Sequence, residues 1–103
     1  MVNSNLYRNI ISKKANLEIS KSWDWYEERQ RGLGDRFFKE LIQQLKQIEQ
    51  FPERYPCKYK SYRETSLNIF PFSIIYKVNK RKNIIVIVSV FHNNRNPSKR
   101  YKE

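Results

Sequence analysis

The chain is 103 residues long, which is enough for one domain around a single hydrophobic core, so we expect one domain over residues 1–103. It contains one cysteine and one histidine, too few for an internal disulfide or for the four ligands of a structural zinc site. Disulfide-stabilised scaffolds and zinc fingers are therefore excluded. No apolar run approaches the ~20 residues of a membrane-spanning helix, and no secretory signal is present, so we expect a cytoplasmic protein without a membrane partner.

The net charge of +11 is concentrated in the second half of the chain. Residues 1–51 carry nine Lys or Arg against seven Asp or Glu, whereas residues 52–103 carry twelve against three, giving +2 and +9. Such a surface can attract nucleic acid or an acidic protein, or it can simply keep the protein soluble. The uneven distribution favours a nucleic acid or an acidic partner.

The first residues predict a short strand followed by an amphipathic helix. Residues 5–11 are rich in β-forming side chains, and Ser12 is a suitable N-cap for the helix that follows. The apolar face of this helix recurs at intervals of four, four and three residues: Ala15, Ile19, Trp23 and Tyr26. Trp25 lies off this face, where a partner could cover it.

A second helix is predicted after a glycine-containing turn. Gly32 and Gly34 can end the first helix and let the next begin at Asp35. The second helix carries a continuous apolar stripe made of Phe37, Phe38, Leu41, Leu45 and Ile48. The two helices should therefore form a hairpin.

The second half of the chain predicts a small sheet. Residues 51–62 contain two prolines and no periodicity, which indicates a loop, and residues 62–68 can form a strand. Residues 70–78 alternate as a half-buried strand does, and a polar turn at 79–83 leads into an apolar run at 84–91, typical of a central strand covered on both faces. The predicted order is β-α-α-β-β-β, an α+β fold with a helical hairpin packed on a small, largely antiparallel sheet.

Seven short motifs span nearly the whole chain: Tyr26-Glu27, Gly32 to Phe37, Ile48 to Pro52, Tyr62-Arg63, Phe70 to Tyr76, Val90 to His92 and Arg95 to Pro97. In order and spacing they resemble the ParE-type members of the RelE/ParE superfamily. The resemblance implies a cytoplasmic, growth-inhibiting toxin of a bacterial type II toxin-antitoxin system, neutralised by a small antitoxin encoded beside it. Such an antitoxin would lay an acidic amphipathic helix or extended segment across the hairpin and sheet.

The resemblance implies one of two activities. Some members of the superfamily cleave mRNA in the ribosomal A site, and others inhibit DNA gyrase without being enzymes. A ribonuclease needs a general base, a general acid and cations that stabilise the phosphorane charge. When the chain is aligned through residues 75–78, Ser73 stands where the ribonuclease branch usually has an arginine, and Asn93 lies near another such position. These differences favour gyrase over the ribosome and mRNA, and an inert chain that only binds antitoxin is the third alternative.

Three residues are candidate catalytic groups only if the chain is a ribonuclease: His92, Arg63 and Arg95. The resemblance to the ribonuclease members, which use a C-terminal Tyr or His, adds Tyr101 as a further candidate. An unperturbed histidine titrates at pH ~6.5 and suits acid or base catalysis, although a histidine at a strand end is more often structural. Arg63 could bind phosphate or an antitoxin carboxylate, or it could pair with Glu64 or another surface acid. Arg95 precedes Asn96, where ParE-type chains commonly have an aspartate. We expect no metal and no cofactor.

Overall fold

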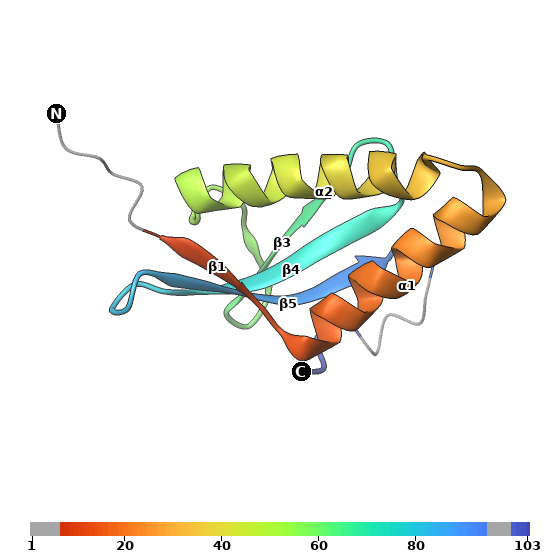
Figure 1. The fold of residues 1–103 in the computed structure, drawn as a ribbon. Coiled ribbons are helices and arrows are strands. Elements are labelled where there is room, and N and C mark those ends of the chain that lie inside the picture. Colours follow the sequence, from red (N-terminus) through yellow and green to blue (C-terminus); the bar gives the residue numbers. More distant parts are fainter. Residues whose placement is uncertain (1–6, 95–99) are drawn as a thin grey trace, which may run out of the picture.

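The protein folds as two helices on a five-stranded sheet. The structure, a computed structural model, describes residues 7–94 and 100–103. Its elements are β1 (Arg8–Ile11), α1 (Lys13–Arg29), α2 (Leu33–Gln50), β2 (Cys57–Tyr59), β3 (Tyr62–Ser66), β4 (Phe72–Asn79) and β5 (Ile84–His92). The strand order is β1-β5-β4-β3-β2, with β1 parallel to β5 and the other pairs antiparallel. Both helices pack on one face of this sheet (Figure 1), which confirms the predicted α+β fold.

The core between the helices and the sheet is built from the apolar positions that the helical and strand periods predict. Phe37 and Phe72 lie at its centre, with ring centroids 4.9 Å apart. The buried residues of this layer are Ala15, Ile19, Phe37, Leu41, Leu45, Ile48, Leu67, Phe70, Phe72, Ile74, Tyr76, Ile85, Ile87 and Val90. A smaller cluster of Ile75, Val88 and Phe91 lies on the other face of the sheet, so β5 is covered on both faces, as predicted. Within the described ranges, no helix is long and apolar enough to cross a membrane.

Two aromatic residues were predicted to lie in the core and do not. Phe38 is 44% exposed, because it lies about 100° around α2 from Phe37, which faces the sheet. Trp23 is only partly buried, and its indole N–H donates to Asp35 Oδ1 at 3.0 Å. Trp23 therefore packs at the junction between the two helices and not in the core between the helices and the sheet.

Glu27 organises the turn between the helices. Its carboxylate accepts hydrogen bonds from the backbone N–H groups of Gly32, at 2.8 Å, and Gly34, at 2.9 Å. Gly32 has a φ of +87° and serves as the N-cap of α2, which therefore begins at Leu33, two residues earlier than predicted. A Cβ at Gly34 would lie 2.8 Å from the backbone oxygen of Trp23, so this glycine permits the close approach of the helices.

The edge of the sheet differs from the prediction. Strand β2 lies within residues 51–62, which were predicted to be a loop, and it pairs with β3 at the outer edge. All three of its residues are exposed, so the alternation that marks a half-buried strand is missing. Strands β3 and β4 are shorter than predicted because the Glu40 carboxylate accepts from the backbone N–H groups of residues 68–70 and holds them in a turn.

Candidate functional site

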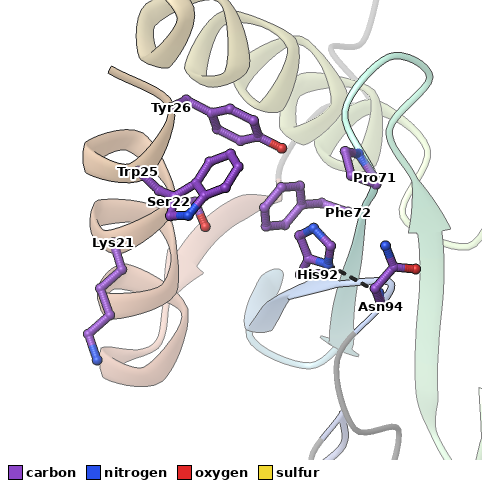
Figure 2. Close-up of a pocket in the computed structure, with 8 residues that line it drawn as sticks. All are labelled: Lys21, Ser22, Trp25, Tyr26, Pro71, Phe72, His92 and Asn94. Carbon is purple, nitrogen blue, oxygen red and sulfur yellow. Dashed lines mark hydrogen bonds between the residues drawn. The ribbon is translucent and has the colours of Figure 1, made fainter. Parts of the chain in front are cut away.

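His92, the last residue of β5, lies on the helix side of the sheet. It is paired with Phe72 of β4, and the two rings meet edge to face with centroids 5.0 Å apart. The Nδ1 atom of His92 accepts a hydrogen bond from the backbone N–H of Asn94 at 3.1 Å. In the neutral ring the proton therefore lies on Nε2, which Figure 2 shows on the side of the ring away from Asn94.

His92 contributes to a half-open cavity between α1 and the ends of β4 and β5 (Figure 2). We call it the Trp25 cavity, with a volume of about 590 Å³ and a lining of Lys21, Ser22, Trp25, Tyr26, Pro71, Phe72, His92 and Asn94. Trp25 and Tyr26 of α1 stand across the cavity from Phe72 and His92. Sequence analysis singled out Trp25 and His92 separately, since the two residues are 67 positions apart in the chain.

Arg63 of β3 serves a structural contact in this fold. Its Nη1 donates to the backbone oxygens of Tyr55, at 2.6 Å, and Glu53, at 3.2 Å. Its Nη2 lies 3.9 Å from the Glu53 carboxylate, so its acidic neighbour is Glu53 rather than Glu64. The side chain is 21% exposed. Arg63 thus fastens the segment before β2 to the sheet.

The structure does not bring His92 and Arg63 together. Their partners on β4 are Phe72 and Tyr76, four residues apart, which corresponds to about 13 Å along the strand. Arg95 lies outside the described residues. The catalytic set predicted for a ribonuclease therefore stays a prediction, with two of its members at separate places on the sheet.

The other face of the sheet carries the two positions that set this chain apart from the ribonuclease branch. Ser73 is 2% exposed, and its hydroxyl donates to Asn93 Oδ1 at 2.7 Å. The hydroxyl of Ser66 on β3 lies 3.3 Å from that of Ser73. An uncharged network thus occupies the place where arginines were expected in a ribonuclease. It offers hydrogen bonds but no positive charge to a phosphate.

The family of the chain follows from comparison with known proteins. The family described as the ParE toxin of type II toxin-antitoxin systems, parDE, matches residues 10–97. The chain belongs to the ParE toxin family. A solved structure titled as the chromosomal ParDE TA system from P. aeruginosa is similar in fold, with a TM-score of 0.74 over 86% of this chain and 98% of that chain at 18% identity. No curated protein sequence matches significantly.

In this ParE-family chain, residues 100–103 pack on the sheet face opposite the helices. Arg100 Nη1 and the Tyr101 hydroxyl both contact the Glu64 carboxylate, at 3.1 and 3.0 Å. The ring of Tyr101 stacks on Tyr59 with centroids 4.8 Å apart. Burial, followed by the hydrogen bond to Glu64, raises the pKa of Tyr101. These contacts could not be predicted from the sequence, because Glu64 and Tyr101 are 37 positions apart.

The last residue of the chain also binds this face. Glu103 accepts from Lys77 Nζ at 2.7 Å and from the Tyr62 hydroxyl. The Lys77 ammonium, and then the Tyr62 hydroxyl, lower the pKa of the Glu103 carboxyl. The cations Lys77 and Arg100 are therefore engaged by the protein's own carboxylates. Within residues 7–94 and 100–103, no cluster of three His, Cys, Asp or Glu could hold a metal ion.

Proposed function

We propose that this chain is the toxin of a type II toxin-antitoxin system, that it inhibits DNA gyrase in the cytoplasm, and that a cognate antitoxin neutralises it. The observation that carries the proposal is the match of the ParE toxin family over residues 10–97. The fold shared with a protein of a ParDE system supports the same assignment. Inhibition by binding requires a surface and no catalytic group.

The sheet face opposite the helices supports gyrase over RNA as the target. RNA cleavage needs cations that stabilise a developing negative charge. Here Ser73 and Asn93 form an uncharged pair, and Lys77 and Arg100 are bound to Glu103 and Glu64. A phosphate on this face would have to compete with two carboxylates for these cations.

The basic half of the chain supports an acidic antitoxin as the partner. Residues 52–103 carry twelve Lys or Arg against three Asp or Glu. An opposite charge on the antitoxin would accelerate association, and salt would screen this effect. We expect the association rate to fall as salt is raised, whereas a rate that is insensitive to salt would contradict the electrostatic part of the proposal.

The alternative function is a ribosome-dependent endoribonuclease that uses His92, Arg63 and Arg95. It is the less supported, but His92 does line an open cavity, with one ring nitrogen not engaged by Asn94. The substitution His92→Ala separates the two functions. Full toxicity of this variant would exclude a catalytic histidine. The ribonuclease would be favoured if the variant loses toxicity but keeps its fold and its antitoxin binding, and if the original chain cleaves a reporter mRNA that the variant leaves intact.

A supercoiling assay tests the proposal directly. Purified chain is added to bacterial gyrase, relaxed plasmid and ATP, and supercoiled product is measured with and without the antitoxin encoded beside the toxin. We expect the chain to abolish supercoiling and the antitoxin to restore it. Full supercoiling in the presence of folded chain, with cell-free translation inhibited by the same sample, would contradict the proposal.

A further inference from the structure

Trp25 is an exposed aromatic side chain held in a fixed orientation. It is 51% exposed, yet the Arg29 guanidinium lies 3.5 Å from its ring centroid and donates to the Trp25 backbone oxygen. The ring of Tyr26 meets it edge to face at 5.1 Å. Covering a side chain that is already ordered costs little conformational entropy, and tryptophans of this kind often dominate the energy of protein interfaces.

The Trp25 cavity beside this side chain has the size and the apolar floor of a binding site. Its volume of about 590 Å³ lies within the range of pockets that bind small ligands or large side chains. Phe72 and Pro71 form apolar walls, and Trp25 forms the rim (Figure 2). An apolar side chain placed here would leave water, pack against the rings of Trp25, Phe72 and Pro71, and gain dispersion contacts.

Each polar side chain that lines the cavity can donate a hydrogen bond, and Asn94 also brings an amide oxygen that can only accept. Lys21 contributes an ammonium group, His92 contributes the N–H on Nε2, and Ser22 and Tyr26 contribute hydroxyls. Burial raises the pKa of Tyr26, so its hydroxyl stays protonated. The described lining contains no carboxylate. Such a set of donors suits an occupant that combines an apolar group with a negative charge.

We propose that the Trp25 cavity is a docking site for an acidic segment of the antitoxin. A large apolar side chain of that segment fills the cavity beside Trp25, and a neighbouring carboxylate meets Lys21 and His92. The net charge of +11 and the donors in the lining argue for this occupant over a cationic or purely apolar one. The assignment of the occupant rests on the proposed neutralisation by an antitoxin.

A pair of small probes tests the chemistry of the cavity without the antitoxin. Phenylpropionate and phenylpropylamine have the same ring and chain but opposite charges, and each is titrated at millimolar concentration into the folded chain while NMR follows the side-chain resonances. We expect phenylpropionate to shift the indole N–H of Trp25 and the ring of His92. The indole N–H of Trp23, which is bound to Asp35, should stay unchanged. Equal shifts with both probes, or no shift with either, would overturn the proposed chemistry.

Two pairs of variants test the occupant in the complex with the antitoxin encoded beside the toxin. Trp25→Ala removes the aromatic rim, and Phe51→Ala is its matched control, since Phe51 is 52% exposed at the far end of α2. Lys21→Glu reverses the charge at the cavity, and Lys46→Glu on α2 is its control. We expect the cavity variants to raise Kd by about tenfold or more and the controls by about twofold or less. The melting temperature of each free variant checks folding.

The outcomes distinguish the cavity from the proposed function. If the original chain binds the antitoxin and all four variants bind equally well, the docking site is wrong while neutralisation by an antitoxin stands. If the original folded chain does not bind the antitoxin, the proposed function itself fails. If the cavity variants retain antitoxin binding but lose inhibition of gyrase, the cavity belongs to the target interface and the docking proposal is overturned.

Discussion

Replacing Glu18 by alanine tests how α1 is joined to the centre of the sheet. Beyond Ile87, strand β5 has no further pairing with β1 in the described structure, and α1 supplies the partners instead. The Glu18 carboxylate accepts from the Ser89 hydroxyl at 2.8 Å and from the Val90 backbone N–H at 2.9 Å. Ser89 is fully buried. The substitution therefore leaves a buried hydroxyl and a strand N–H without their acceptor.

The expected loss is large for a domain of this size. A hydrogen bond to a charged group contributes roughly 1.5–3 kcal/mol, and an orphaned buried donor costs roughly 1–3 kcal/mol. Because these contributions overlap, we expect Glu18→Ala to lower the free energy of unfolding by about 3 kcal/mol. Glu18→Gln keeps one amide oxygen as an acceptor and should cost about 1 kcal/mol. Total stabilities of small domains are roughly 5–15 kcal/mol, so the alanine variant would lose a substantial part.

Urea unfolding followed by circular dichroism measures these differences. Glu28→Ala is the matched control, since Glu28 is an exposed acid on the same helix and should change stability by less than about 0.5 kcal/mol. The double variant with Ser89→Ala should cost less than the sum of the single variants, because removing the hydroxyl removes one orphaned donor. A loss for Glu18→Ala no greater than that for Glu28→Ala would refute the reasoning.

Three further predictions concern the helix junction, the β2 segment and the chain end. Gly34→Ala should lower the free energy of unfolding by about 2 kcal/mol or more, because its Cβ would lie 2.8 Å from the backbone oxygen of Trp23. Gly32→Ala should lower it by about 1 kcal/mol, because residue 32 has a positive φ. Equal urea midpoints for the two variants would contradict the close approach of the helices at Gly34. Arg63→Ala should lower the free energy of unfolding by about 2 kcal/mol, because the backbone oxygens of Glu53 and Tyr55 lose their donor. An unchanged urea midpoint would argue against that contact. The Lys77 ammonium holds the pKa of the Glu103 carboxyl below its usual range, so the contact stabilises the fold fully above the ordinary pKa of a glutamate and loses this effect as the pH falls through the lowered pKa. Hydrogen exchange at the chain end should show this pH dependence, and Glu103→Gln should abolish it.

The apolar periodicity of the sequence predicted the main elements of the fold because burial repeats locally along a helix or strand. Ser12 is an example of a local signal that held, since its hydroxyl accepts from Ala15 N–H at 3.0 Å and caps α1. Phe38 shows the limit of the same reasoning, because an apolar residue beside the stripe looks like part of it. Strand β2 was missed because an exposed edge strand of three residues has no apolar pattern.

The candidate site was less accessible to sequence reasoning because it depends on contacts between distant residues. Glu18 is not one of the apolar positions that predicted its helix, yet it binds β5 across 71 positions. The Trp25 cavity likewise joins α1 to the ends of β4 and β5. The charge difference between Ser73 and the usual ribonuclease arginine could be read from the sequence, but not its hydrogen bond to Asn93. Contacts between residues so far apart in the sequence leave no periodic pattern, so they become visible only in the folded structure.

Pulse labelling after induction of this chain alone in bacteria tests the central claim most directly. Methionine and thymidine incorporation are followed in parallel over the first minutes, with co-expression of the antitoxin as the control. An early fall in thymidine incorporation, with methionine incorporation falling later and both restored by the antitoxin, is the result expected of a gyrase inhibitor. An early fall in methionine incorporation, with thymidine incorporation initially unchanged, would contradict the account and place the target in translation.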